Sequence, residues 1–298
     1  MRCTAIAMGA GVVLAVAATS AAARAQDAGS PQVVEKEGWP VEVVKRPLTL
    51  ARGMVEIVAP VGINLSSDRV GRPVFVAPSA YYGVTDALTV GVRHFLGACF
   101  GGGPNGCPNA YNDLGVDSVW RLWRFHGADL ALGAGFDAAP IADPFTLSGE
   151  VRIIARWSGG PFALAIAPML NVGLTDRSDP RALKRVSVGF PLATYSFGWV
   201  QDVPGNKEYL SLPATIQVQV IPQLALAVAG ALNGPLDPPS GGFNDAYTVP
   251  FAVAAIVSPT STVDVGASFT FVNLLGRDSP GAGRGEVRGL QLFAALRL

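Results

Sequence analysis

Two histidines are the side chains of this 298-residue sequence best suited to acid–base chemistry. A hydrolytic histidine needs a nucleophile within hydrogen-bond reach. His94 alternates in step with Val90 and Val92, and the next residue in that series is Leu96 rather than a serine. His126 lies in a short turn with no nucleophile beside it. The sequence therefore predicts no catalytic residue and no enzyme.

Charged residues recur on one side of the alternating segments, opposite the most apolar side. Such residues can bind ions or pair with one another. Five are acidic and five are basic: Glu56, Arg93, Asp117, Arg121, Asp137, Glu150, Arg152, Arg156, Asp264 and Arg297. Rings of charge of this kind orient solutes in narrow pores. Balanced charges on neighbouring strands can instead pair with one another and fill the space between them.

A pair of cysteines lies in the stretch GACFGGGPNGCPNAYND, which is too rich in Gly, Pro and Asn for a helix or strand. In an exported chain, Cys99 and Cys107 are best interpreted as a disulfide that closes a loop. Metal binding is the alternative, but two cysteines with no histidine or carboxylate cluster nearby make a poor site. The stretch also lacks the G-x-x-x-x-G-K-[ST] pattern of a phosphate-binding loop. We expect no metal and no cofactor.

The first 25 residues have the features of a secretory signal peptide. A basic start, Met1-Arg2, is followed by an apolar run over residues 5–17 and by the small-x-small sequence Ala23-Arg24-Ala25. The apolar run is shorter than the roughly 20 residues that a membrane-spanning helix needs, and no later charge-free run reaches that length. Cys3 falls in the part that is removed.

Composition narrows the fold class and the partners. The formal net charge is zero and the charges are spread along the chain, so no basic patch indicates nucleic acid. Half of the residues are hydrophobic, yet the sequence contains 35 Gly and 23 Pro. This balance is typical of many apolar strands separated by turns.

Alternation of apolar and polar residues with a period of two recurs in twelve segments. They cover about residues 55–65, 74–84, 87–96, 114–124, 129–138, 146–157, 162–174, 208–220, 224–232, 247–257, 263–273 and 287–298. Each is long enough for a tilted strand to cross a bilayer. The connections after the even segments are tight, and those after the odd segments are longer. An antiparallel meander therefore gathers its long loops at one end and its short turns, with both termini, at the other.

This architecture resembles that of the outer-membrane β-barrel proteins of Gram-negative bacteria, over about residues 52–298. One side of nearly every segment is apolar, and the aromatic residues Tyr82, Phe125, Trp157 and Phe162 flank the short turns. The resemblance implies an all-β, up-and-down, antiparallel transmembrane barrel of about twelve strands, with outer-membrane lipid around it and both termini in the periplasm. The expected organisation is a signal peptide over residues 1–25, a flexible periplasmic leader over 26–45, and the barrel over 46–298.

The chain ends on GLQLFAALRL, which reads as a strand up to its last residue. The resemblance implies that this strand pairs with the first one and removes the open edge of the sheet. It also implies recognition of this strand by the barrel assembly machinery. Members of this class usually end in Phe, whereas this chain ends in Leu298.

Two functions follow from such a barrel, because its chemistry must lie in the lumen and the loops. Small inward residues such as Gly133, Gly135 and the alanines of segments 162–174 and 224–232 leave room for a narrow porin-like channel for small polar solutes or ions. Pairing of Arg93 with Asp117, and of Glu56 with Arg297, would instead favour a largely closed barrel that presents loops for binding or envelope structure. The long connection over residues 175–207 is expected to fold inward as a constriction, to contain a hairpin, or to stand outside as a binding surface. The sequence predicts no particular oligomeric state.

Overall fold

The computed structural model describes residues 35–66, 70–101, 107, 109–141, 145–175, 177, 182–187, 198–203, 206–238, 242–276 and 286–298. The expected signal peptide and residues 26–34 of the expected leader lie outside this part of the chain. Among the described residues, no helix is long and apolar enough to cross a membrane.

Twelve antiparallel strand positions, which we call staves, close into one barrel, as the period-two alternation predicted. A stave consists of one strand or of two consecutive strands in line. In chain order the strands that build them are β1 (Val55–Asn64), β2 (Val74–Val76), β3 (Ser79–Thr85), β4 (Leu88–Arg93), β6 (Leu114–Phe125), β7 (Ala128–Ala138), β8 (Leu147–Gly159), β9 (Phe162–Ile166), β10 (Met169–Gly173), β13 (Tyr209–Ile221), β14 (Leu224–Pro235), β15 (Phe251–Val257), β16 (Val263–Phe271) and β17 (Arg288–Arg297). Two staves are each made of two strands, β2 with β3 and β9 with β10. Pro78 and Pro168 interrupt them, because proline has no N–H to donate to the neighbouring strand.

The first and last strands close the barrel. β1 and β17 pair in register from Glu56 opposite Arg297 to Asn64 opposite Gly289. The N–H of Leu298 donates to the carbonyl of Val55 at 2.9 Å, and the N–H of Val55 donates back at 3.0 Å. The predicted pairing of the terminal strand is therefore confirmed, and it extends to the last residue of the chain. No edge of the main sheet is left open at this seam.

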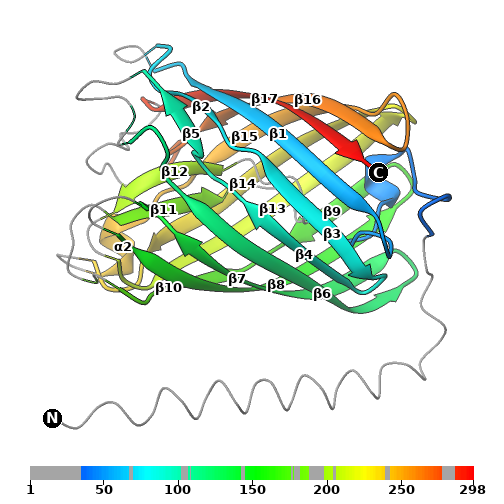
Figure 1. Cartoon of the computed structure of the whole chain (residues 1–298), viewed down its shortest axis with the longest axis horizontal. Coiled ribbons are helices and arrows are strands. Elements are labelled where there is room, and N and C mark those ends of the chain that lie inside the picture. The colour runs from blue at the N-terminus through cyan, green and yellow to red at the C-terminus, as the bar shows by residue number, and fades with distance from the viewer. Residues whose placement is uncertain are drawn as a thin grey trace, which may run out of the picture.

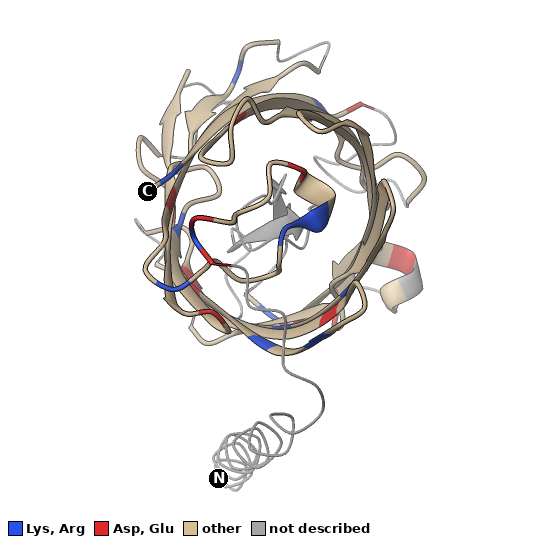
Figure 2. Cartoon of the chain, turned by 90° about the vertical axis from the view of Figure 1, so that its right-hand side faces the viewer, with Lys and Arg blue, Asp and Glu red and all other residues tan. Residues whose placement is uncertain are grey.

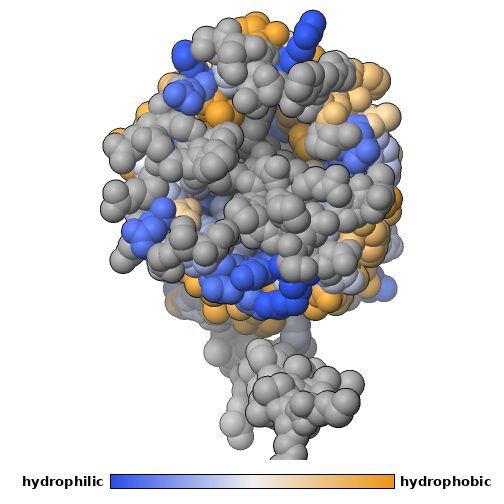
Figure 3. All heavy atoms as spheres, turned by 90° about the vertical axis from the view of Figure 1, so that its left-hand side faces the viewer, coloured by the Kyte–Doolittle hydropathy of each residue, from blue (hydrophilic) through white to orange (hydrophobic). Residues whose placement is uncertain are grey.

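Long and short connections lie at opposite ends of the barrel (Figure 1). The short turns and the C-terminus share one end, which we call the turn end, and the opposite end is the loop end. Tyr82, Phe125, Trp157 and Phe162 are about half exposed near the short turns. In the view onto the loop end, hydrophobic residues show on the flanks of the barrel and hydrophilic ones among the loops (Figure 3). An apolar wall with aromatic residues near its rim suits a bilayer and its interface.

Several elements lie outside the twelve staves. β5 (Ala98–Phe100) pairs with β2, and α2 (Phe243–Ala246) is a single helical turn before β15. The long connection contains a hairpin of β11 (Ala182–Ser187) and β12 (Gly198–Val203). This hairpin forms its own two-stranded sheet and adds no stave to the barrel.

The third predicted segment is shorter than expected. β4 ends at Arg93 instead of continuing to Leu96. Leu96 is buried against Phe75, Ala77 and Cys99. The amides of residues 95–97 donate to the Asp113 carboxylate rather than to a neighbouring strand. Alternation continued through this kink, so the sequence pattern did not reveal where the strand ends.

The N-terminal part of the chain is packed against the barrel wall rather than forming a flexible leader through Lys45. Residues 35–54, which we call the N-terminal segment, lie within the ring of strands at the turn end (Figure 2). The segment contains the short 3-10 helix η1 (Val43–Lys45). Val43, Val44 and Leu48 are at most 1% exposed. The barrel thus encloses a polypeptide segment in addition to its own wall side chains.

The predicted disulfide joins Cys99 to Cys107, eight residues apart in the sequence. It ties the connection before β6 to β5 next to the buried side chain of Phe75. Replacing both cysteines by serine is expected to lower the free energy of unfolding by about 2–3 kcal/mol, the loop-closure entropy of a short cross-link. Urea unfolding of the oxidised protein and of the double variant would measure this difference. Equal urea midpoints would contradict it.

Candidate functional site: a charged lumen crossed by the N-terminal segment

The ten charged residues predicted to face inward are all buried or nearly so. Nine of them are less than 9% exposed, and Arg152 keeps 10% of its side chain exposed. They fall into two ion-pair networks near opposite ends of the barrel, with Arg121 and Arg156 outside both. Asp129 is also buried, at 4% exposure, although it was not predicted. Its step in the alternation, two before Ala131, would have identified it.

The network near the loop end, which we call the loop-side cluster, consists of Arg93, Asp117, Asp137, Glu150 and Arg152. The Arg93 guanidinium lies 2.8 Å from the Asp137 carboxylate, 3.0 Å from that of Glu150 and 3.6 Å from that of Asp117. Arg152 pairs with Asp117 at 2.5 Å and also contacts Glu150. The cluster therefore holds three carboxylates and two guanidinium groups. The predicted pairing of Arg93 with Asp117 is found as the longest contact of a larger network.

Glycines of the wall make space for the loop-side cluster. A Cβ on Gly133 would lie 2.6 Å from the Cγ of Arg152, and one on Gly135 would lie 3.2 Å from Nη2 of Arg93. These small residues therefore leave room in the wall, as expected, and at this height the room lies next to arginine side chains. The space that they leave is taken up by arginine side chains from neighbouring strands.

The network near the turn end, which we call the turn-side cluster, joins three strands to the N-terminal segment. Arg297 lies 2.5 Å from Glu56 and 2.5 Å from Asp264, so the predicted pair across the seam is present. Arg46 completes the cluster from the N-terminal segment. Its guanidinium donates to both Asp264 carboxylate oxygens, at 2.6 and 3.0 Å. Carboxylates and guanidinium groups alternate along this chain of contacts, with two of each.

Arg156 binds the N-terminal segment from the opposite direction. Its guanidinium, on β8, donates to the backbone carbonyls of Val43 at 3.1 Å, of Val44 at 2.6 Å and of Arg46. Arg46 of the segment thus binds the wall, and Arg156 of the wall binds the segment. Arginine suits both contacts because its planar fork presents several donors in fixed directions.

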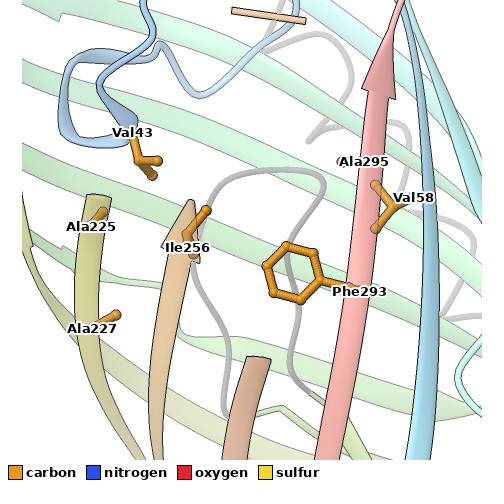
Figure 4. Close-up of a cluster of buried hydrophobic side chains, with 7 residues drawn as sticks. All are labelled: Val43, Val58, Ala225, Ala227, Ile256, Phe293 and Ala295. Carbon is orange, nitrogen blue, oxygen red and sulfur yellow. The ribbon is translucent and has the colours of Figure 1, made fainter. Parts of the chain in front are cut away.

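Apolar contacts anchor the segment on different parts of the wall. Val43 packs in a cluster with Ala225, Ala227 and Ile256, which Figure 4 shows together with Val58, Phe293 and Ala295. Leu48 packs with Val119 of β6, Ala131 of β7, Ile154 of β8 and Ala167, which lies between β9 and β10. Trp39, Leu50 and Met54 pack with Tyr81 of β3. Because these strands lie on separate sides of the barrel, the segment crosses the lumen from wall to wall.

The two sides of the lumen differ in chemistry. The charged residues of the loop-side cluster come from β4, β6, β7 and β8. Alanine predominates on β9 and β14, where Ala163, Ala165, Ala225, Ala227, Ala229 and Ala231 are all buried. The buried amide of Gln217 lies on this side and has no hydrogen-bond partner among the described residues. The lumen is therefore charged along β4 to β8 and lined by small, weakly apolar side chains along β9 and β14.

His94 has a structural environment. Its Nδ1 contacts the carbonyl of Pro78, at the break between β2 and β3, and its Nε2 lies 2.7 Å from the Tyr111 hydroxyl. Both ring nitrogens are thus engaged near the loop end of the wall. This arrangement holds a kinked stretch of the barrel together.

Comparisons with known proteins agree with this architecture. No protein-family model matches the sequence, and no curated protein matches it. Among solved structures, a NanC porin matches with a TM-score of 0.56 over 81% of this chain and 100% of that chain, at 7% sequence identity. The COG4313 outer-membrane channel from Pseudomonas putida F1 matches with a TM-score of 0.52 over 84% of this chain and 97% of that chain, at 11% identity. The predicted resemblance to outer-membrane β-barrel proteins is therefore confirmed at the level of the fold.

Proposed function

We propose that this protein is an outer-membrane barrel whose lumen forms a narrow channel for small polar solutes or ions. Its termini and short turns face the periplasm, and its apolar wall contacts lipid. The C-terminal strand is the part that the barrel assembly machinery recognises during insertion. The two solved structures above support the channel as a class, because one is described as a porin and the other as an outer-membrane channel.

The observation that carries this proposal is the width of the lumen. An eight-stranded barrel is filled by its own side chains, and the diameter grows with the number of strands. Here the lumen contains a backbone segment that spans it, held by side chains such as Arg46 and Leu48. A barrel that accommodates a polypeptide segment has a wider lumen than one filled by its own wall side chains, and this width supports a path for small solutes.

The charges of the loop-side cluster favour cations. The cluster contains three carboxylates, those of Asp117, Asp137 and Glu150, and two guanidinium groups, those of Arg93 and Arg152. Acidic rings select cations in channels by the same electrostatic principle. We therefore expect K⁺ to pass more readily than Cl⁻.

A largely closed barrel that presents its loops is the second candidate. It is favoured by the burial of the turn-side cluster, in which Arg46 is 1% and Asp264 is 0% exposed. Burial to this degree means that the described residues keep solvent away from both side chains. The two candidates differ in what happens when the N-terminal segment is removed.

Planar-bilayer recording of the full chain and of a chain lacking residues 35–50 tests the channel. We expect stepwise currents from the shortened chain, with a reversal potential in a KCl gradient that indicates cation preference. Asp137→Asn in the shortened chain should reduce that preference. Silence of both proteins at all voltages, with the shortened chain shown to be folded, would reject the channel in favour of the closed barrel.

A further inference from the structure

We propose that the turn end of the barrel is a binding site for an arginine-containing peptide, and that its resident ligand is residues 40–50 of the same chain, held as a removable plug. The role of this plug as a gate rests on the proposed channel function. The binding site itself does not, since it is defined by contacts that exist whether or not the lumen conducts.

The wall presents an acidic socket that one arginine of its own does not neutralise. Glu56 and Asp264 are both buried, and Arg297 lies between them. Without the N-terminal segment, Glu56 and Asp264 would keep their ion pairs with Arg297, but Asp264 would lose its two-point contact with Arg46. A buried carboxylate needs a paired charge or hydrogen-bond donors. The socket therefore requires a cation, and Arg46 supplies it in a two-point contact with Asp264.

The site also recognises the backbone conformation of the ligand. Arg46 Nε also donates to the carbonyl of Pro40 at 3.0 Å, and the two hydrogens of Nη2 are shared among Asp264, the carbonyl of Val41 at 2.8 Å and the Ser258 hydroxyl at 3.1 Å. These bonds fold residues 40–46 into a compact loop around the guanidinium group. Arg156 then binds three carbonyls of that loop, including those of Val43 and Val44. Recognition thus combines one side chain, Arg46, with the backbone that surrounds it.

Apolar contacts complete the site on either side of the arginine. Val43 occupies the small-residue surface formed by Ala225 and Ala227. Leu48 occupies a second apolar position beside Val119 and Ile154. A matching ligand therefore has the pattern apolar, two residues, arginine, one residue, apolar, as residues 43–48 have.

The geometry permits the plug to leave through the turn end. Residues 35–38 are exposed, and the described segment enters the ring of strands from that end (Figure 2). Withdrawal requires breaking the contacts of Arg46 and Arg156, the apolar packing of Val43 and Leu48, and several hydrogen bonds of the segment to β4, β6, β13 and the turn before β4. It requires no opening of the strand pairs of the wall. Lys45 does not take part, because its ammonium group is exposed and its ion pair is with Glu42 at 2.7 Å. That hydrogen bond lowers the pKa of the Glu42 carboxyl, within the segment itself.

Thiol labelling measures whether the plug is seated, independently of conduction. Val43→Cys introduces a thiol at a position that is 0% exposed. We expect slow labelling by a water-soluble maleimide in this variant. Adding Arg46→Ala or Asp264→Asn should raise the labelling rate roughly 100-fold or more, because breaking a buried ion pair is strongly destabilising. Lys45→Ala, the matched control, should leave the rate unchanged. Equal rates in all four proteins would overturn the binding site.

Binding in trans tests the ligand class directly. The chain lacking residues 35–50 is folded in detergent and titrated with a fluorescent peptide of residues 40–50, PVEVVKRPLTL. We expect saturable binding that is roughly 100-fold weaker for the peptide carrying Arg46→Ala, and likewise for the barrel carrying Asp264→Asn. A peptide carrying Lys45→Ala should bind like the original. Equal binding of all three peptides would contradict recognition through Arg46.

Bilayer recordings of the same proteins separate the gate from the channel. Currents from Arg46→Ala but not from Lys45→Ala would support the gate. Equal currents from the full chain and from Arg46→Ala would overturn the plug as a gate and leave the channel intact. If labelling and peptide binding behave as expected while every variant stays silent, the channel function fails and the peptide site stands.

Discussion

A chain that ends at Glu286, and so lacks β17, is expected to give no folded barrel. β17 pairs along its whole length with both β1 and β16. Its loss exposes two strand edges to the hydrocarbon of the bilayer. Each unpaired backbone group there costs several kcal/mol, and open sheet edges do not occur at that depth. Loss of folding should therefore be complete rather than partial.

Refolding into detergent micelles measures this effect without the assembly machinery. The full-length barrel should migrate faster on an unheated denaturing gel than after boiling, and the truncated chain should show only the slower band. Leu298→Ala is the matched control, because the two hydrogen bonds between Leu298 and Val55 use backbone atoms. A faster-migrating band from the truncated chain would contradict the seam as the element that closes the barrel.

The staves were predictable because lipid imposes one simple rule on their outward side. In β17, Leu292 and Leu296 are exposed while Phe293, Ala295 and Arg297 are buried, as alternation requires. The same parity identified the inward charges, since a charge on the lipid side is costly. Connection lengths then gave the order of the strands. Alternation and turn length are local properties, so a single sequence contains them.

The plug was not predictable in the same way, because it follows no period. Residues 39–50 contain Trp39, Val43, Val44, Leu48 and Leu50 at irregular spacing, around Arg46. Their burial depends on partners more than 50 residues away along the chain, such as Asp264 and Arg156. The density of apolar residues before the first strand was the available signal. Five apolar side chains within so few residues are not expected in a leader that stays exposed to solvent.

The full set of ion-pair partners in the lumen could not be predicted from the sequence either. Strand parity indicated that Arg93 faces inward, and neighbouring strands indicated Asp117 as its partner. Asp137 and Glu150 make the shorter contacts, because the guanidinium group reaches past β6 over the glycines of β7. Side-chain reach across two strands depends on the barrel's curvature and on small residues in between. Neither is visible in period-two alternation.

Arg93→Ala is expected to lower the free energy of unfolding by about 3–5 kcal/mol, whereas Arg121→Ala should change it by less than about 1 kcal/mol. Arg93 is 2% exposed and pairs with three carboxylates, so its loss removes a buried guanidinium partner from Asp117, Asp137 and Glu150 at once. Arg121 is also buried, at 7% exposure, but among the described residues its guanidinium group makes no hydrogen bond and no ion pair within 4 Å, and its attraction to Asp129 and Asp86 acts over longer distances. Burial and residue type are therefore matched, and only the pairing differs.

Urea unfolding of the detergent-folded proteins, followed by tryptophan fluorescence, measures both changes as shifts of the midpoint. Combining Arg93→Ala with Asp137→Asn should restore part of the lost stability, because the second change removes a carboxylate that had been paired with Arg93. Equal midpoints for Arg93→Ala and Arg121→Ala would show that the loop-side cluster contributes no net stability. In that case its three carboxylates would have to be explained by ion passage alone, and the cation preference of the shortened chain would become the decisive measurement.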